Sequence, residues 1–578
     1  MISRSAIVAA TLAIMPATLA FGQTVASPSD AVTTPPLSVA QTPLPPRAII
    51  FRFETYRDLF RAIREKRWDE AGLLLTVAPP GALTSYARAE YYLAAGSPRV
   101  ETEALLALLR DTPDLPQAAQ LARLAEKRGA AALPYIPAEN RLRWAGSAPI
   151  RARAKSIASD PAGQQLAITI PALIDADDPA GAELALNGVV GSLSPDARTE
   201  WQQRVGWAYY IENRDADALR LSRLAQTGSG EWRVHADWTA ALAAWRLKDC
   251  RYSAYSFDKV ALGTSDQELK AAGLYWAARA YTACGEPHLV QSKLRAAAQI
   301  DETFYGILAR EALGVATVIA PPAPTVPSPR FASQRNVKLA GELARLGEEQ
   351  HAGDTIRHQA KIGSASDHAQ LIALADQLDL PSTQIYLAHN APAGAQPDDF
   401  ARYPTPNWRP ERGWRVDPAL VYAHALQESG FRREVVSPAG AFGLMQVRPG
   451  TARDMANDRG IGFATSDLAR PSINLEYGQS YLEMLRASPV TGGLLPKVIA
   501  AYNAGPAPVA RWNTEVRAGN DPLLYIESLP YWETRGYIGI ILRNYWMYQA
   551  QFRQPAPTRA VLAQNQWPRF PDAPAAVR

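Results

Sequence analysis

At 578 residues the chain is too long for a single ordinary hydrophobic core, so several domains are expected. Its composition, 47% hydrophobic and 20% charged, is that of a soluble globular protein and excludes a largely disordered one. The formal net charge of +4 is too small to argue for nucleic-acid binding, although it would not oppose binding to an anionic wall polymer. Ala and Leu dominate the first half of the chain, which favours helices.

The first 22 residues have the pattern of a secretory signal peptide. Arg4 precedes a stretch of small and apolar residues that ends at Phe21, and Ala20 and Gly22 occupy the small-residue positions before a cleavage site near Gln23. A transmembrane anchor is the alternative, but the stretch is rich in Ala and Thr and only marginally long enough to span a bilayer. We therefore expect export, cleavage of the signal peptide and no integral membrane segment in the mature chain.

A long helical region follows. Residues 23–47 are rich in Pro, Thr and Ser, which predicts a disordered leader. At residues 48–319, short amphipathic segments alternate with breaks at Pro, Gly or Asp, a pattern typical of helical hairpins. An Ala–aromatic pair recurs about every 36 residues, at Ala208–Tyr209, Ala244–Trp245 and Ala280–Tyr281. A repeat of this length suits a two-helix solenoid unit, and the alternative is a helical array without strict repetition. Both predict an α-helical scaffold.

Two further shifts in composition divide the rest of the chain. A Pro-rich break opens a predicted helical linker domain at residues 320–400, because Pro cannot continue a helix. Trp, Tyr, Arg and Gly are frequent at residues 401–553, and a Pro/Ala-rich tail at 554–578 is expected to be poorly ordered. Cys250 and Cys284 either form a disulfide or remain free buried thiols, and in both cases their role is structural.

A candidate catalytic acid lies at the end of an apolar helix. Asp417 and Pro418 form a helix start, ALVYAHALQ follows, and Gly430 is a natural stop just after Glu428. Burial and the negative pole of the helix dipole both favour the protonated carboxyl, so the pKa of Glu428 should be raised. A raised pKa suits a general acid that works near neutral pH. The alternative is a carboxylate that merely pairs with a nearby arginine.

Three later segments carry further candidate residues. They are SPAGAFGLMQ at 437–446, AAYNAGP at 500–506 and ESLPYWETRGY at 527–537. The first is a Gly-rich turn, which lets backbone approach a ligand closely. The other two bring aromatic and amide side chains to helix ends.

Together with QESGF at 427–431, these segments resemble, in order and spacing, the catalytic domain of the soluble lytic transglycosylases. The resemblance implies a mostly α protein with three parts. An N-terminal α-superhelix of hairpins, shaped as a ring or horseshoe, precedes a helical linker domain. A lysozyme-like catalytic domain at 401–553, with a small β-sheet, follows.

The resemblance also implies a reaction. Glu428 would protonate the oxygen that bridges N-acetylmuramic acid and N-acetylglucosamine in a β-1,4 glycan strand of peptidoglycan. The ionised Glu428 would then take the proton of the C6 hydroxyl, which closes a 1,6-anhydro ring. This chemistry needs one carboxylate, whereas ordinary glycosidases commonly use two. The resemblance places such an enzyme in the periplasm.

Other residues of the motifs receive roles by the same resemblance. The expected substrate-binding residues are Ser437, Met445, Gln446, Tyr502, Asn503 and Glu533. Arg535 is expected to pair with a carboxylate at the site. For Ser437 and Gln446 the alternative is a role in the turn itself, and for Met445 and Tyr537 it is core packing.

Two rival functions stay open at this point. One is a lysozyme-like hydrolase on the same fold, whose products would end in a reducing sugar. The other is a non-catalytic helical-repeat scaffold that binds the wall. No cofactor and no metal are expected, because the chain lacks a phosphate-cradling Gly loop and metal-ligand spacing of His or Cys. Glycan strands of peptidoglycan are the expected partner, and nucleic acid is not expected. Whether a synthase or a secretion system is a further partner is unknown. We expect a monomer.

Overall fold

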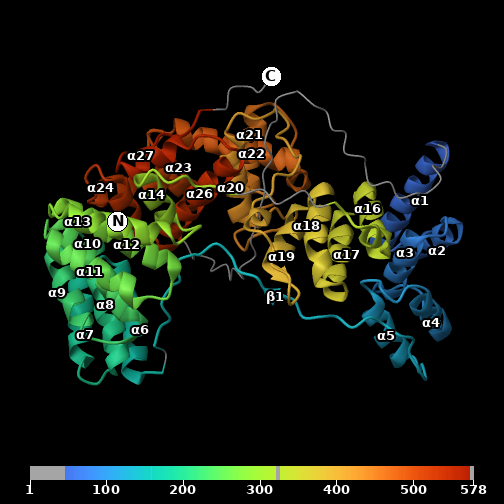
Figure 1. The fold of residues 1–578 in the computed structure, drawn as a ribbon, viewed down its shortest axis with the longest axis horizontal. Helices are drawn as coiled ribbons and strands as arrows, with labels where there is room; N and C mark the ends of the chain where they lie inside the picture. The colour runs from blue at the N-terminus through green and yellow to red at the C-terminus, as the bar shows by residue number, and fades with distance from the viewer. Residues whose placement is uncertain (1–45, 158, 320–325, 573–578) are drawn as a thin grey trace. The chain divides into compact units, whose positions relative to one another are not determined.

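The computed structural model describes residues 46–157, 159–319 and 326–572 (Figure 1). The predicted signal peptide, and the predicted leader as far as residue 45, lie outside the described residues. The described chain is mostly helical, which confirms the predicted fold class. None of its helices combines the length and the apolar character needed to cross a bilayer.

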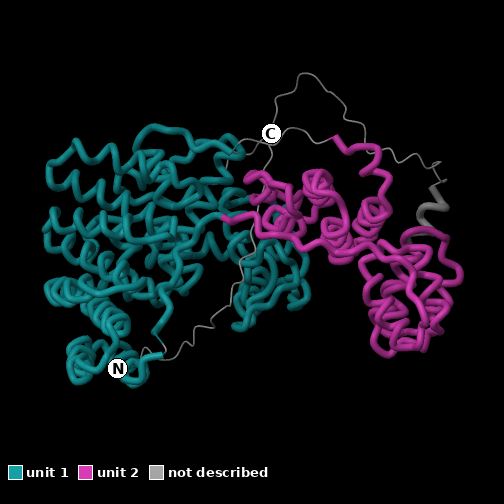
Figure 2. Tube along the Cα trace, turned by 60° about the horizontal axis from the view of Figure 1, so that its bottom comes forward, with its two compact units in different colours: residues 1–14, 148–319, 409–578 teal, residues 15–147, 320–408 magenta. Residues whose placement is uncertain are grey.

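Contacts divide the chain into two compact units (Figure 2). Of the described residues, unit 1 comprises 148–157, 159–319 and 409–572, and unit 2 comprises 46–147 and 326–408. This grouping cuts across the predicted domains, because the first hundred described residues join the predicted linker rather than the rest of the predicted superhelix. The predicted sequence limits of the domains remain predictions.

Unit 2 is a helical assembly built from two separate stretches of chain. Its first stretch contains α1 (Pro46–Arg64), α2 (Trp68–Val77), α3 (Ala82–Leu93), α4 (Thr102–Asp111) and α5 (Ala118–Lys127). Its second stretch contains α15 (Pro329–Ser333), α16 (Arg335–Leu346), α17 (Glu349–Ile362), η1 (Ala365–Asp367), α18 (His368–Gln377), α19 (Pro381–His389) and η2 (Asp399–Arg402). The two strands β1 (Arg143–Trp144) and β2 (Asn390–Ala391) pair antiparallel.

One hydrophobic core joins the two stretches of unit 2. Leu59 and Phe60 of α1 and Leu339 and Leu343 of α16 are fully or almost fully buried in it. Polar contacts at the surface follow the same pairing, for example the ion pair from Arg64 to Glu348 at 2.7 Å. Helices α1 and α3 of the first stretch therefore bury apolar side chains against α16 of the second stretch.

The first stretch of unit 1 is a series of antiparallel helices. They are α6 (Pro161–Asp175), α7 (Pro179–Val189), α8 (Pro195–Ile211), α9 (Asp215–Ala225), α10 (Gly230–Arg246), α11 (Cys250–Gly263), α12 (Gln267–Ala283), α13 (Pro287–Ala298) and α14 (Phe304–Ala312). Several begin with a side-chain cap followed by Pro; Asp160, for instance, accepts a hydrogen bond from the Gly163 amide at 2.8 Å. These caps explain why the breaks at Asp and Pro marked the hairpins in the sequence.

The three Ala–aromatic pairs lie near the ends of α8, α10 and α12, the first helix of successive hairpins. All three alanines are buried. The Tyr209 hydroxyl donates to Glu183 of α7 at 2.7 Å, and the Tyr281 hydroxyl donates to Asp258 of α11 at 2.8 Å. The aromatic side chain of these two pairs therefore ties its helix to the preceding one.

The two cysteines form a disulfide within this array. Cys250 is the first residue of α11 and Cys284 caps the end of α12, and their Cα atoms lie 5.5 Å apart. The sequence left a disulfide and two free thiols as alternatives, and the structure selects the disulfide.

Replacing both cysteines, Cys250→Ser with Cys284→Ser, should lower the free energy of unfolding by roughly 2–4 kcal/mol, because the cross-link restricts the unfolded chain. The bond spans 34 residues, which is long enough for an effect of this size. Urea denaturation of the oxidised protein measures the change. Reducing the unmodified protein should bring its midpoint to that of the double variant, and an unchanged midpoint would contradict a stabilising role.

The second stretch of unit 1 forms a compact helical domain. Its elements are α20 (Pro418–Ser429), α21 (Pro449–Asp458), η3 (Thr465–Ala469), α22 (Pro471–Ala487), α23 (Leu495–Ala504), α24 (Pro506–Glu515), α25 (Pro522–Glu527), α26 (Trp532–Gln551) and α27 (Pro557–Ala563). The long helix α26 is buried along most of its length and packs on α20, α23 and α14. The expected small β-sheet is wrong for the described part of this domain, which has only isolated bridges, such as Phe442 with Val447. The Gly-rich segment turns too often to extend a ladder.

The predicted disorder of the tail is also wrong for residues 554–572. They form α27 and a segment that docks on the domain. Leu562 is fully buried, and Arg559 pairs with Glu311 at 2.6 Å. The Leu495 amide donates to the Pro568 carbonyl at 2.8 Å. Buried apolar side chains such as Leu562 order this segment, although its Pro/Ala-rich composition is typical of disorder.

Candidate active site

Glu428 lies in the last turn of α20, as the sequence predicted. Asp417 caps the helix by accepting from the Ala419 amide at 3.0 Å, and Pro418 occupies the first turn. Gly430 ends the helix with φ of +56°, a backbone conformation that glycine adopts without strain. Most residues between cap and carboxylate are buried, so the helix is fixed on all sides and holds the partly buried Glu428 in its last turn.

A single strong hydrogen bond holds the carboxyl group. The Tyr537 hydroxyl, from α26, donates to Glu428 Oε1 at 2.5 Å. Burial raises the pKa of Glu428 to about 7; the hydrogen bond from Tyr537 opposes that rise, and the nearby charge of Glu533 adds to it. Among the residues that the structure describes, Glu428 makes no ion pair with an arginine. The structure therefore does not support the alternative of a carboxylate that only pairs with a nearby arginine.

Two more rings complete the surroundings of the carboxyl group. Tyr502 of α23 donates from its hydroxyl to the Met445 carbonyl at 2.8 Å, and its ring lies 4.8 Å from that of His424. His424 is fully buried one helical turn before Glu428, and burial lowers its pKa to about 4. Burial also holds the pKa of both Tyr502 and Tyr537 well above the usual range. At neutral pH these three neighbours are uncharged.

Ser437 and Gln446 hold the Gly-rich turn together. The Ser437 hydroxyl accepts from the Ala441 amide at 3.0 Å. The Gln446 side-chain amide donates to the carbonyls of Val435 and Gly443 at 3.1 and 2.9 Å. The turn role, which the sequence left as the alternative, is therefore present for both residues.

Met445 contributes backbone rather than side chain to the site. Its side chain is fully buried and packs on Gly478 of α22, where a Cβ atom would meet Met445 Sδ. Core packing, the alternative for this residue, is what its side chain shows, and a role of Met445 in substrate binding remains a prediction. Its carbonyl still faces the site through the bond from Tyr502.

Asn503, at the end of α23, lies beside Glu533, at the start of α26. The Asn503 amide donates to Glu533 Oε1 at 3.5 Å, and the Thr534 hydroxyl donates to Asn503 Oδ1 at 2.7 Å. Glu533 is exposed. This pair joins the ends of α23 and α26, which carry Tyr502 and Tyr537.

Arg535 does not make the expected pairing. Its guanidinium lies over the rings of Trp207 and Trp532, 4.3 and 5.2 Å from their centroids. Within the described part of the chain it forms no ion pair, and its Nη1 atom is buried without a hydrogen-bond partner. Stacking on aromatic faces replaces the carboxylate that the sequence led us to expect.

The arrangement can give and take a proton near neutral pH. The carboxyl of Glu428 has a pKa close to 7, a fixed orientation and one donor that can stay bound to it in either protonation state. The sequence identified the carboxylate but not its partner: Tyr537 was assigned to the core, and His424 was not singled out. The close spacing of His424 and Glu428 on one helix was the available signal for the histidine.

Known proteins share this domain. Residues 408–524 match the family model described as the transglycosylase SLT domain. The soluble lytic murein transglycosylase of Salmonella typhimurium is 30% identical over 242 residues, which are 41% of this chain and 32% of that protein. The protein of the same name from Escherichia coli K12 is 33% identical over 174 residues, 30% of this chain and 25% of that one. The chain thus spans about a third or less of the length of these relatives.

Two solved structures share the fold. The lytic transglycosylase Slt of Pseudomonas aeruginosa matches with a TM-score of 0.52 and 18% identity over 88% of this chain and 87% of that one. The 70 kDa soluble lytic transglycosylase of Escherichia coli matches with a TM-score of 0.55 and 17% identity over 90% of this chain and 100% of that one. The resemblance seen in the motifs is confirmed: residues 408–524 match the transglycosylase SLT domain, and the chain is similar to soluble lytic murein transglycosylases.

Proposed function

We propose that this protein is a peptidoglycan lytic transglycosylase. It cleaves the β-1,4 bond between N-acetylmuramic acid and N-acetylglucosamine and leaves 1,6-anhydro-N-acetylmuramic acid ends. The observation that carries the proposal is the carboxyl of Glu428, whose pKa is raised to about 7 and which Tyr537 holds by a 2.5 Å hydrogen bond. The substrate places the protein in the periplasm after removal of its signal peptide.

The reaction uses Glu428 twice. Its protonated carboxyl first gives the proton to the bridging oxygen, and the bond from that oxygen to the anomeric carbon breaks. The N-acetyl group of the substrate stabilises the positive charge on the anomeric carbon. Glu428, now a carboxylate, takes the proton of the C6 hydroxyl while the C6 oxygen bonds to the anomeric carbon. No water is consumed, and Glu428 is again protonated.

The neighbours of Glu428 support both halves of this cycle. Tyr537 donates to the carboxylate when it is charged, which limits the cost of ionisation in a buried place. Tyr502 lies beside the reacting sugar, and Ser437, Gln446 and the Met445 carbonyl bound the cleft from the Gly-rich turn. Asn503 lines it from the end of α23, and Glu533 lines it from the start of α26.

Digestion of purified peptidoglycan tests the proposal, with the products read by mass spectrometry. Products that end in 1,6-anhydro-muramic acid, one water lighter than hydrolysis products, are expected. Products that end in a reducing sugar would instead show that the protein is a hydrolase. Absence of any product from folded protein would favour the wall-binding scaffold.

Replacing Tyr537 by Phe should lower the maximal rate about tenfold, since one positioned hydrogen bond to a charged group is lost. The same bond lowers the pKa of Glu428, so its loss raises that pKa. Because the first step needs the protonated carboxyl, activity falls as pH rises through this pKa, and the alkaline limb should move to higher pH in the variant. A pH–rate profile measures both effects. An alkaline limb that stays in place or moves down would contradict the assignment.

A further inference from the structure

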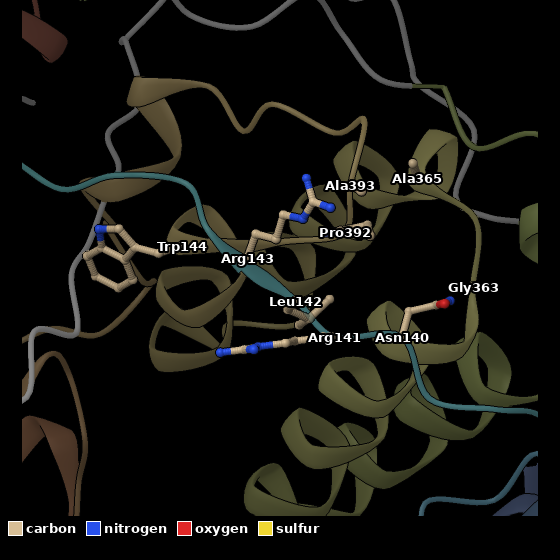
Figure 3. A pocket seen from close by; sticks show the side chains of 9 residues that line it. All are labelled: Asn140, Arg141, Leu142, Arg143, Trp144, Gly363, Ala365, Pro392 and Ala393. Carbon is tan, nitrogen blue, oxygen red and sulfur yellow. The ribbon is translucent and has the colours of Figure 1, made fainter.

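A cavity of about 750 Å³ lies in unit 2, which does not contain Glu428 (Figure 3). It is lined by Asn140, Arg141, Leu142, Arg143, Trp144, Gly363, Ala365, Pro392 and Ala393. The side chains on the wall that faces the strand segment are small, which leaves the space open. Figure 3 shows Trp144 at one end, Asn140 and Gly363 at the other, and the guanidinium of Arg143 near Pro392 and Ala393.

The segment that carries the arginines is fastened on both sides. Arg143 pairs with Ala391 across the two-stranded sheet, and the Ala145 amide donates to the His389 carbonyl at 2.8 Å. On the other side the Asn140 amide donates to the Lys361 carbonyl at 2.9 Å. The backbone between these bonds is therefore held in place before a ligand arrives, which reduces the backbone entropy lost on binding.

The charges in this cavity have no counterpart. Arg141 and Arg143 are both exposed, and among the described residues neither forms an ion pair or a side-chain hydrogen bond. No carboxylate is among the lining residues. By contrast, other arginines of unit 2 form ion pairs, as Arg64 does with Glu348. Two unpaired guanidinium groups on one short strand segment suit a ligand with carboxylates, whose geometry matches the guanidinium fork.

Trp144 adds a flat apolar surface beside the arginines. One face of its indole stacks on His389, with ring centroids 4.9 Å apart and an angle of 20° between the planes. The side chain nevertheless remains 47% exposed. An exposed indole held rigid by stacking on one side presents its other face to a ring-shaped or apolar partner, at little entropic cost.

We propose that this cavity binds a carboxylate-bearing piece of the glycan polymer, with separate carboxylates on Arg141 and Arg143, whose guanidinium groups point to different sides of the strand segment (Figure 3), and a sugar ring on Trp144. The inference rests on the proposed function, because peptidoglycan is the polymer that supplies both chemistries. Its carboxylates come from two sources, the acidic peptide stem and the lactyl group of the sugar. The cavity thus gives the protein a second hold on the polymer that it cleaves.

Fluorine NMR of the full chain labelled with fluorotryptophan provides the test. The Trp144 signal is assigned by its absence in Trp144→Phe. Three probes are titrated: the muropeptide disaccharide with its peptide, the same disaccharide without peptide, and the free peptide. A saturable shift of the Trp144 signal with the first probe is expected. The other two distinguish the source: the lactyl carboxylate if the peptide-free sugar is as effective, and the stem if it is not.

Charge variants show whether the arginines do the binding. Arg141→Gln with Arg143→Gln should weaken binding about fivefold or more, as expected for two exposed charge-assisted contacts. Arg99→Gln with Arg123→Gln is the matched control: it removes the same charge from two exposed arginines of unit 2 that do not line the cavity. The control should bind as the unmodified protein does. Thermal unfolding verifies that both double variants are folded.

Failure of this inference differs from failure of the proposed function. A Trp144 signal that does not move, that moves equally after loss of Arg141 and Arg143, or that moves equally with an unrelated polyanion such as heparin would overturn the site. If digestion still yields anhydro ends, the proposed reaction stands without it. A specific shift from a protein that yields no anhydro ends would keep the site and remove the reaction.

Discussion

Replacing Glu428 by Gln is expected to slow peptidoglycan cleavage by about a thousandfold, within the range of roughly 10²–10⁴ that a positioned acid–base contributes. The amide has the shape of the carboxyl and can still accept from Tyr537, so the site should keep its form. It cannot give a proton to the bridging oxygen or take one from the C6 hydroxyl. Release of anhydro-muropeptides over time, read by mass spectrometry, measures the loss.

A nearby glutamate supplies the control. Glu434 is exposed and lies only a few residues beyond Glu428, so Glu434→Gln makes the same chemical change outside the site. This variant should cleave at the rate of the unmodified protein. If Glu428→Gln retained more than about a tenth of that rate, a general acid–base role for this residue would be refuted.

Replacing Gly443 by Ala should lower the free energy of unfolding by about 3 kcal/mol or more, since overpacking and a left-handed backbone both cost energy. Gly443 has φ of +75°, and an added Cβ would lie 2.3 Å from Asn474 Nδ2 and 2.7 Å from the Leu468 carbonyl oxygen. Asn474 braces the turn: it donates to the Phe442 and Leu468 carbonyls and accepts from the Met445 amide. The substitution would displace this brace.

Gly440 separates the two causes. It has nearly the same φ, +76°, but an added Cβ would meet no atom within 4 Å. Gly440→Ala should therefore cost only the backbone strain, about 1–2 kcal/mol. Urea denaturation of the two variants compares them. Equal losses of stability would mean that steric contact with Asn474 contributes nothing.

Local features of the fold were predictable from the sequence, and long-range ones were not. The caps at Asp417 and Gly430 and the hairpin breaks depend on neighbouring residues, and the structure has them where the sequence placed them. The partners of an apolar helix face are not encoded locally. The core shared by Leu59 and Leu339 joins stretches that the sequence assigned to different domains. The prediction of a disordered tail was wrong for a related reason, because composition does not show that Leu562 is buried against the rest of the domain.

In the candidate site, too, residues fixed by local sequence were predictable, and residues brought in by packing were not. Glu428 was predictable because its helix, its end and its motif all lie within a dozen residues. Tyr537 belongs to a different helix, and only the packing of α26 on α20 brings its hydroxyl to the carboxylate. Arg535 illustrates the opposite error: the motif suggested a carboxylate partner, whereas α8 supplies the Trp207 ring instead.

The two-part construction of unit 2 has a consequence for synthesis. Helices α1–α5 are made first, but their partners α16 and α17 emerge only after residues 148–319 have been translated. Until then the apolar faces around Leu59 and Leu83 lack the cover that α16 gives them, and such exposed surface is prone to aggregation. The nascent N-terminal segment should therefore depend on a chaperone for longer than a chain whose neighbours in sequence are also its neighbours in space. A fragment that ends at residue 319 lacks α16 and α17, so its N-terminal helices should stay dependent on a chaperone.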